Sequence, residues 1–310
     1  MTSTPSPSGG IRIGVDLGGT KIEAIALAAD GTIRARERVA TPRAYGETVR
    51  AIATLVNRVE ASAGAAGAPV GVGIPGAVTP STGLVKNANS VWLIGKPLGR
   101  DLEALLGRSV RLANDANCFA ISEAADGAGA GAGVVFGVIL GTGVGGGIVV
   151  HGRALEGPNL VAGEWGHNPL PWMTPSEFPG PPCYCGKHGC VETFVSGPGL
   201  ERDYADAVGA PLRSADIVTA AAGGAPAAIA ALARYHDRLA RSLASVINVL
   251  DPDVIVLGGG MSNLPDLAES VAGLLPRFVF SDSVHTRVVR NRHGDSSGVR
   301  GAAWLFPRPV

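Results

Sequence analysis

Cysteine is scarce in this sequence, and neither sign of charge exceeds the other. The chain has 4 Cys in 310 residues, far below the density of a secreted disulfide scaffold. Lys and Arg number 26, as do Asp and Glu, so no excess positive charge is available and we expect no nucleic acid partner. With 46% hydrophobic and 17% charged residues, the chain is too apolar to be disordered. Its length predicts about two globular domains.

The sequence also has no recognisable signal peptide or membrane helix. Residues 1–10, MTSTPSPSGG, lack the positive and apolar regions of a signal peptide, so we expect a disordered tail and a cytoplasmic location. Residues 127–150 are uncharged over a length that could span a bilayer, but ten of them are Gly. Each Gly costs a helix roughly 1 kcal/mol relative to Ala. The segment therefore predicts a buried strand, turn and strand, with no membrane partner.

Glycine, by contrast, is abundant, with 45 residues and no collagen period. Three glycine-rich turns follow apolar runs, at residues 16–21, 141–147 and 258–260. Each can present backbone N–H groups to an anion. None has the Walker or Rossmann spacing, and a single turn of this kind is more often structural. Three such turns in one chain favour a site whose backbone N–H groups bind the polyphosphate of a nucleotide.

Part of the sequence is repeated. Residues 14–18, GVDLG, match residues 137–141, GVILG, at four of five positions and at an offset of 123 residues. An offset of domain size predicts a duplicated α/β unit. Helical spacing of apolar residues covers 49–59 and 229–250. We expect strands at residues 11–16, 22–27, 70–75, 110–113, 134–140, 148–150 and 254–257.

Polar residues gather at the ends of these strands, where open α/β sheets bind ligands. Asn114, Asp115 and Asn117 follow one strand. Such a cluster is often only a helix N-cap. Near two phosphate turns, its carboxylate can instead accept a hydroxyl proton, while Asp16 can hold Mg²⁺ through water. Both interpretations stay open on the residues alone.

One imidazole and three thiols lie close together in the sequence: His167, Cys183, Cys185 and Cys190. This donor set is typical of a closed, tetrahedral zinc site with a structural role. A disulfide is disfavoured in a reducing cytosol, and free core thiols would not cluster among glycines. The fourth cysteine, Cys118, is typical of a small core residue.

Two carboxylates flank the expected metal ligands. On composition alone, Glu164 and Glu192 would be solvated surface charges. Fixed beside a zinc loop, they become candidate hydrogen-bond acceptors for a polyol.

Five motifs in combination resemble the ROK family of bacterial sugar kinases, repressors and related proteins. They are DLGGTK at Asp16, LANDAN at Leu112, GEWGH at Gly163, CYCGKHGCVE at Cys183 and LGGG at Leu257. The resemblance covers about residues 11–307. KNANSVWL, GEWGHNPLPWM and HGDSSGVRGAAWL most resemble the fructokinase (mannokinase) members, and N-acetylglucosamine kinases are similar over the same stretches.

The resemblance implies two ribonuclease-H-like α/β domains of the actin-like ATPase fold, with a cleft between them. The first domain would cover residues 11–118 and be completed by a C-terminal helix at about 292–310, for which Asp295, Ser296 and Ser297 are suitable N-cap residues. The second would cover residues 119–291 and include the zinc loop. A homodimer is also implied.

The resemblance also assigns roles to individual residues. Asp115 matches the general base, and His167 would serve both zinc and sugar. The expected sugar-binding residues are Asn89, Asn114, Asp115, Glu164, His167 and Glu192. The expected ATP-binding residues are Gly14, Val15, Asp16, Leu17, Gly18, Gly19, Thr20, Lys21, Gly141, Thr142, Gly143, Val144, Gly145, Gly146, Gly147, Gly258, Gly259 and Gly260.

The reaction implied is ATP-dependent phosphorylation of the 6-hydroxyl of D-fructose, with Mg²⁺ accompanying ATP. Mannose, N-acetylglucosamine and glucose are alternatives, because an insert at residues 172–182 covers the sugar and its shape is not encoded in the motifs. A sugar sensor without catalysis is a further alternative. A DNA-binding repressor is disfavoured, since only ten residues precede Ile11.

Overall fold

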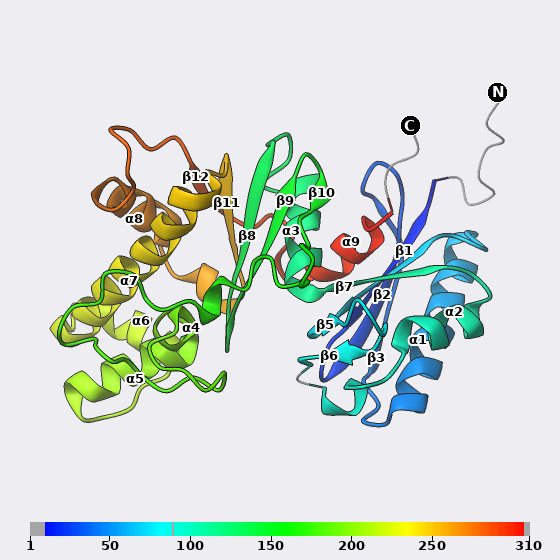
Figure 1. Cartoon of the computed structure of the whole chain (residues 1–310), viewed down its shortest axis with the longest axis horizontal. Helices are drawn as coiled ribbons and strands as arrows, with labels where there is room; N and C mark the ends of the chain where they lie inside the picture. The colour runs from blue at the N-terminus through cyan, green and yellow to red at the C-terminus, as the bar shows by residue number, and fades with distance from the viewer. Residues whose placement is uncertain (1–9, 89, 307–310) are drawn as a thin grey trace. The chain divides into compact units, whose positions relative to one another are not determined.

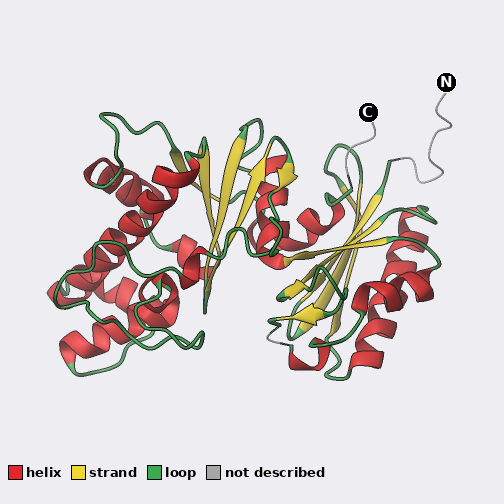
Figure 2. Ribbon diagram, in the orientation of Figure 1, coloured by secondary structure: helices red, strands yellow, loops and turns green. Residues whose placement is uncertain are grey.

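A computed structural model describes residues 10–88 and 90–306 of the chain and divides it into two units (Figures 1 and 2). Unit 1 takes in the residues up to Gly131, the segment Gly152–Ala162 and the residues from Asp295 onward. Unit 2 takes in Ala132–His151 and Gly163–Gly294. Except for Gly10, the predicted N-terminal tail lies outside the described residues.

In the described residues, the first sheet has five strands in the order β3-β2-β1-β4-β7. Its strands are β1 (Arg12–Leu17), β2 (Lys21–Leu27), β3 (Ile33–Ala40), β4 (Val70–Ile74) and β7 (Val110–Asn114), and a separate pair is formed by β5 (Ala77–Val78) and β6 (Val85–Lys86). The helices of unit 1 are α1 (Tyr45–Ala63), α2 (Leu98–Leu106), α3 (Asp115–Ala125) and α9 (Ser297–Ala303).

The second sheet follows the order β10-β9-β8-β11-β12. Its strands are β8 (Val134–Leu140), β9 (Val144–Val150), β10 (Arg153–Ala154), β11 (Val254–Gly258) and β12 (Arg287–Arg290). The helices of unit 2 are α4 (Val191–Val195), α5 (Gly197–Val208), α6 (Ser214–Ala222), α7 (Pro226–Leu250) and α8 (Leu267–Leu274). The predicted strand, turn and strand within residues 127–150 are confirmed as β8 and β9.

The two sheets are built on one plan, which confirms the 123-residue repeat. In each, the first strand pairs antiparallel with the next strand in sequence and parallel with a later one. In the parallel pairs, Ile13 pairs with Val70, and Phe136, which is 123 residues after Ile13, pairs with Ile255. The two sheets therefore share their strand order and pairing as well as the glycine motif.

Apolar side chains at helical spacing hold the longest helices against these sheets. In α1, the predicted core positions Val49, Ile52, Leu55, Val56 and Val59 are all buried. They join the inner faces of β1 and β4 in one apolar cluster. The helix ends at Gly64, whose φ of 62° favours glycine. The predicted helix at 229–250 is confirmed as α7, which packs in the apolar cluster of unit 2 in the same way.

Helix α9 rests directly on the backbone of the first sheet. A Cβ on Gly14 of β1 would lie 2.1 Å from the carbonyl oxygen of Val299, and one on Gly71 of β4 would lie 1.9 Å from that of Ala302. Atoms cannot approach this closely, so glycine at both strand positions is what allows the helix to reach the sheet.

This packing corrects part of the predicted ATP site. The expectation placed Gly14, Val15 and Leu17 at the ATP phosphates. Gly14 is buried under α9, and the side chains of Val15 and Leu17 are 0% and 1% exposed. All three belong to the core, because the motif runs from the buried strand into the exposed turn.

The predicted boundary between the domains, after Cys118, falls inside helix α3. The whole helix belongs to unit 1 because α9 holds it there: the Ser297 hydroxyl donates to the Glu123 carboxylate at 2.7 Å, and Arg300 pairs with Asp126. The described part of the C-terminal segment, which includes α9, belongs to unit 1. Ser296 occupies the N-cap of α9, but its side chain makes no capping hydrogen bond.

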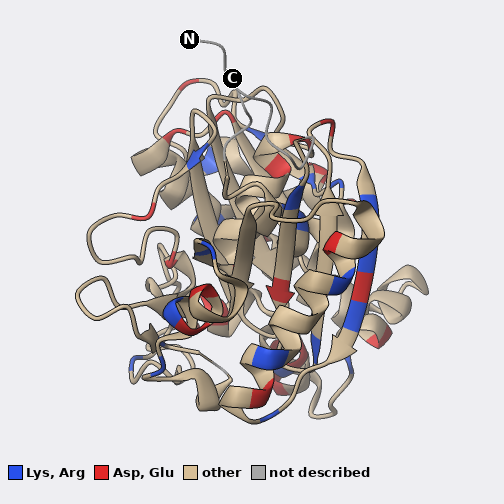
Figure 3. Cartoon of the chain, turned by 90° about the vertical axis from the view of Figure 1, so that its right-hand side faces the viewer, with Lys and Arg blue, Asp and Glu red and all other residues tan. Residues whose placement is uncertain are grey.

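Lys and Arg residues alternate with Asp and Glu residues along the ribbon drawn in Figure 3. Within the described residues, no single helix is long and apolar enough to cross a membrane. Helices α6 and α7 meet the length and composition criteria only as a pair, and that pair is bent by 117°.

The contact between α9 and the sheet predicts the effect of one added methyl group. We expect Gly71→Ala to lower the free energy of unfolding by about 3 kcal/mol, because the backbone of α9 must move away. Gly273→Ala is the matched control, since Gly273 lies in α8 with nothing within 4 Å of the added carbon, and should stabilise by about 1 kcal/mol. Chemical denaturation measures both. Equal stability of the two variants would contradict this account of the packing.

Candidate active site and metal centre

The first glycine turn joins β1 to β2. Gly18 closes it by donating its N–H to the carbonyl of Lys21 at 3.0 Å, and the Thr41 hydroxyl donates to the Gly18 carbonyl at 2.7 Å. Gly19, Thr20 and Lys21 are exposed. These residues are the part of the predicted motif that a ligand can contact.

Asp16 lies at the end of β1, just before this turn. Burial, with smaller contributions from the carboxylates of Asp115 and Glu23, raises the pKa of its carboxyl group to about 6, against the lowering effect of Lys21. Asp115 therefore lies close enough to Asp16 for the two charges to interact. A pair of carboxylates that repel each other is a favourable place for a divalent cation.

Asn114 and Asp115 connect β7 to helix α3. The Asn114 side chain accepts from the N–H of Ala116 at 2.9 Å, which confirms the N-cap interpretation, and donates to the Gly76 carbonyl at 2.9 Å. The Asp115 carboxylate also accepts from the Ala116 N–H, at 2.8 Å, and the residue is exposed. The N-cap and functional interpretations are compatible, because the cap fixes the turn that presents Asp115.

Two further polar residues share a pocket with Asn114. Asn117 and Glu156 line it together with apolar side chains of β4, β5 and β7. The side-chain oxygen of Asn117 is buried and has no hydrogen-bond partner among the described residues. The sequence motif around Asp115 contains Asn117 but assigns it no role, and no motif contains Glu156. The expected sugar residue Asn89 lies outside the described residues.

The second glycine turn is held by a residue that was expected at the sugar. Glu192, in α4, accepts from the N–H of Val144 at 2.9 Å. A Cβ on Gly143 would lie 2.6 Å from the same carboxylate oxygen. An expected sugar ligand and an expected ATP turn are therefore in direct contact, which their separation of 48 residues does not reveal.

The third glycine turn lies beside the second. Gly259 has a φ of 80°, and a Cβ there would lie 2.3 Å from the carbonyl oxygen of Leu140, which precedes Gly141. Helix α5 also begins here, with the N–H of Gly197 donating to the Gly141 carbonyl at 2.8 Å. Sequence reasoning missed this helix start, although Ser196 followed by Gly and Pro is a usual N-terminal signal.

Two glycines of the second motif lie in the strand that follows the turn. Gly146 and Gly147 are buried in β9. A Cβ on Gly146 would lie 2.8 Å from both the Gly163 carbonyl oxygen and the indole ring of Trp165. Packing therefore requires glycine at position 146, while Gly147 is buried in the same strand.

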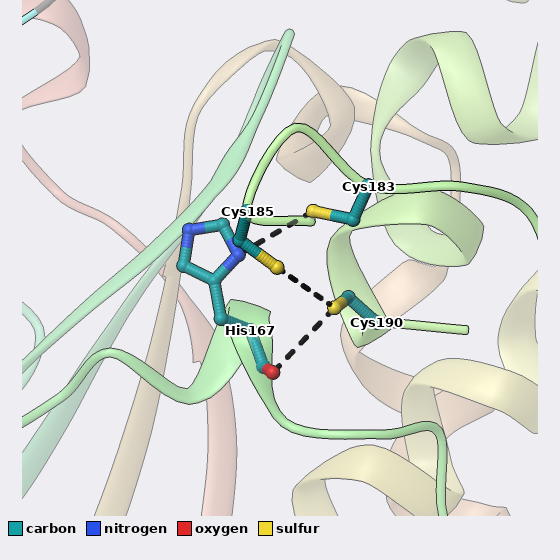
Figure 4. Close-up of side chains that lie close together, drawn as sticks. All are labelled: His167, Cys183, Cys185 and Cys190. Atoms are coloured by element: carbon teal, nitrogen blue, oxygen red, sulfur yellow. Dashed lines mark hydrogen bonds between the residues drawn. The ribbon is translucent and has the colours of Figure 1, made fainter. Parts of the chain in front are cut away.

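His167, Cys183, Cys185 and Cys190 lie together, as the sequence predicts (Figure 4). Their donor atoms all fall within 4.8 Å of one another. The His167 Nδ1 atom is 3.6 Å from Cys183 Sγ, and Cys185 Sγ is 3.6 Å from Cys190 Sγ. A disulfide needs a sulfur separation of about 2.0 Å, so these thiols are free.

These separations suit a metal. Ligands about 2.3 Å from a central zinc ion, at tetrahedral angles, are ~3.8 Å apart. The observed distances of 3.6 Å are close to that value. One imidazole and three thiolates also form the donor set that zinc prefers. The residues present therefore fit the ion that the sequence predicts.

The other ring nitrogen of His167 points to a residue that the sequence did not single out. His167 Nε2 lies 2.9 Å from the hydroxyl of Tyr184, and the two rings meet edge to face. Burial, with smaller contributions from the charges of Glu192 and Glu164, raises the pKa of Tyr184 to about 12. Both carboxylates expected at the sugar are therefore close to the metal loop.

The pattern of the ROK family matches residues 12–308. N-acetyl-D-glucosamine kinase of Escherichia coli (strain K12) is 41% identical over 297 residues, covering 94% of this chain and 98% of the relative. The chain therefore belongs to the ROK family and is one of its sugar kinases, which transfer phosphate from ATP to a hexose.

Two solved structures are similar over nearly the whole chain. The ROK hexokinase from Thermus thermophilus has a TM-score of 0.85 at 33% identity, covering 95% of this chain and 97% of that one. A ROK family glucokinase from Streptomyces griseus, solved with glucose and AMPPNP, has a TM-score of 0.75 at 30% identity, covering 97% and 100%. The expected actin-like ATPase fold is thereby confirmed.

The raised pKa of Asp16 predicts a stability that depends on pH. Above about pH 6 the folded chain must hold a buried charge that the unfolded chain, with the usual value of 3.8, holds in water. We expect Asp16→Asn to raise the free energy of unfolding by about 2 kcal/mol at pH 8 and by much less at pH 4.5. Thermal unfolding without added metal or nucleotide measures the difference.

The exposed Glu47→Gln serves as the control, because its effect should be the same at both pH values. An Asp16→Asn effect that is independent of pH would contradict the assignment of a buried, protonatable Asp16.

Proposed function

We propose that this protein phosphorylates D-fructose at its 6-hydroxyl, with MgATP as the donor. The observation that carries the kinase chemistry is Asp115, an exposed carboxylate fixed at the start of α3 and close to Asp16. The preference for fructose rests on the residues of the sequence, namely the stretches KNANSVWL, GEWGHNPLPWM and HGDSSGVRGAAWL.

Asp115 acts as the general base. Its carboxylate accepts the proton of the sugar hydroxyl as that oxygen attacks the γ-phosphorus of ATP and ADP leaves. The Ala116 N–H bond and the N-cap of α3 keep the carboxylate in a fixed place. Asp16, at the end of β1, would hold Mg²⁺ through water, which supplies charge neutralisation for the phosphates.

The proposed sugar ligands are side chains that can pair with hydroxyl groups. In unit 1 this is the amide of Asn114, and in unit 2 these are the carboxylates of Glu164 and Glu192 and the imidazole of His167. The glycine turns at residues 18–21, 141–143 and 258–260 offer backbone N–H groups to ATP. Zinc held by His167, Cys183, Cys185 and Cys190 would be structural, since all four positions belong to the protein.

N-acetylglucosamine is the second candidate substrate. It is favoured by the relative that is 41% identical over nearly the whole chain and bears the name of an N-acetyl-D-glucosamine kinase. The two candidates share the reaction and differ at C1 and C2 of the sugar. Discrimination between them depends on a few hydrogen bonds worth about 1–3 kcal/mol.

The role of Asp115 predicts the kinetics of two variants. Asp115→Ala and Asp115→Asn should each lower kcat about 1000-fold, because neither side chain can accept the proton. Sugar affinity should stay within a few fold, as measured by calorimetry. Asn retains an acceptor for the Ala116 N–H, so it controls for loss of the local turn. An active variant of either kind would rule out Asp115 as the base.

A parallel ADP-release assay with fructose, mannose, glucose and N-acetylglucosamine tests the substrate. Fructose should lead in kcat/KM by at least about tenfold, which corresponds to about 1.4 kcal/mol. If N-acetylglucosamine leads instead, the reaction stands and the choice of sugar is overturned. Turnover of none of the four sugars would contradict the proposed kinase and favour a sugar sensor.

Removal of zinc should weaken sugar binding and leave nucleotide binding nearly unchanged. In a chelated sample, the loop carrying His167 and Glu192 loses its anchor, so sugar affinity should fall by at least about tenfold. Binding of an ATP analogue should change far less. Readdition of zinc should restore sugar binding, and Cys185→Ser should reproduce the loss. Normal sugar phosphorylation by a metal-free sample would show that the loop does not depend on the ion.

A further inference from the structure

A cluster of buried charges ties the insert at residues 172–182 to helix α7. Glu177, in the insert, accepts from Arg238 at 2.8 Å and from Arg241 at 2.8 and 3.0 Å. Arg241 also donates to the carbonyls of Pro171 and Trp172, at 3.0 and 2.9 Å. The insert is thus held through one side chain and through its own backbone.

The three charged groups are almost completely removed from solvent. The side chains of Glu177, Arg238 and Arg241 are 7%, 9% and 4% exposed. Burial acts to raise the pKa of Glu177, but the hydrogen bonds from the two arginines outweigh it and lower that pKa to about 2. Arg238 also pairs with Asp203 at 2.6 Å, and Arg241 pairs with Asp237 at 2.9 Å. Removing the charge of Glu177 would therefore leave each buried arginine with one carboxylate partner in place of two.

The insert leads directly to the metal ligands at both of its ends. Next to Pro171, the N–H of Leu170 donates to the Gly189 carbonyl at 2.8 Å. At the other end, the N–H of Gly189 donates to the Pro181 carbonyl at 2.9 Å. Both connections meet at Gly189, which precedes the ligand Cys190. A displacement of the insert would therefore move the metal ligands through these two hydrogen-bonded connections.

The segment that carries the metal ligands has little regular secondary structure. Apart from the 3₁₀ helix Trp165–His167, residues 164–190 form turns and isolated bridges, without a helix or a sheet strand. Backbone hydrogen bonds within the segment shape its turns, such as that from the Cys183 N–H to the Lys187 carbonyl at 2.8 Å. The ion pairs of Glu177 add a charged attachment of this segment to α7.

We propose that Glu177 is a positioning residue for sugar binding, holding the metal loop against α7 through Arg238 and Arg241. This rests on the proposed sugar kinase function. Glu177 does not touch the sugar. It sets the place of the loop on which His167 and Glu164 are carried, and so it acts on sugar affinity and on metal retention together.

Two variants test the proposal from opposite sides of the cluster. Glu177→Gln keeps the shape of the side chain and removes its charge. Arg241→Lys keeps the positive charge and loses the bonds to the backbone of the insert. Arg234→Met is the matched control, because Arg234 lies on the same helix and pairs with Asp203 of α5 at 2.7 Å. Asp203 keeps its ion pair with Arg238 in this variant.

In both test variants we expect the KM for sugar to rise at least about tenfold and zinc to pass to a chelator at least about tenfold faster. The kcat and the affinity for an ATP analogue should stay within about twofold of wild type. Arg234→Met should match wild type in all four measurements. Each variant is measured as the full-length, zinc-loaded protein.

Three results would overturn the proposal. They are wild-type sugar KM and zinc release in the test variants, an equal loss of nucleotide binding, and the same losses in Arg234→Met, which would indicate general weakening of α7. If Glu177→Gln does not fold, the measurements on Arg241→Lys alone test the proposal, because the lysine keeps the positive charge and leaves no carboxylate unpaired. If the wild type phosphorylates no hexose, the proposed function fails, but zinc release still tests the positioning role.

Discussion

The strands at the centre of both sheets are buried along their length, and this constraint places the chemistry of the protein. Strand β1 is covered by α1 on one face and α9 on the other, so a polar side chain that could face a ligand appears only near the end of the strand, at the largely buried Asp16. Strand β7 ends at Asn114, and β8 and β11 run directly into glycine turns. Parallel strands end at one edge of a sheet, so burial itself gathers the ligand-binding groups of each unit there.

The abundance of glycine has two physical causes in this chain. Some glycines, such as Gly19, lie in exposed turns. Others, such as Gly14, Gly71 and Gly146, let a helix, a loop or an indole ring pack against a strand backbone. A sequence motif contains glycines of both kinds, because the turn and the strand beside it are continuous in the chain. Only the packing in the structure shows which glycines belong to the turn and which to the strand.

Much of the architecture could be predicted from the sequence, and for local reasons. The apolar periods of α1 and α7 and the repeat of the β-hairpin are properties of short stretches. The metal ligands were found because three of the four lie within eight residues. The contact of Glu192 with Val144 and the ion pairs of Glu177 could not be found in this way. Each joins segments 48 to 64 residues apart, and an isolated Glu in a proline-rich insert has no local signature.

The bond between Glu192 and the N–H of Val144 has a thermodynamic consequence. In the proposed kinase, this one carboxylate serves the sugar while it also orders the turn that faces ATP. A change in the interaction of this carboxylate with the sugar alters its bond to the turn, and the reverse also holds. Sugar binding and nucleotide binding are therefore linked by a coupling free energy. Linkage requires reciprocity: whatever factor bound sugar applies to the affinity for nucleotide, bound nucleotide applies to the affinity for sugar. The order in which the substrates arrive cannot alter that factor.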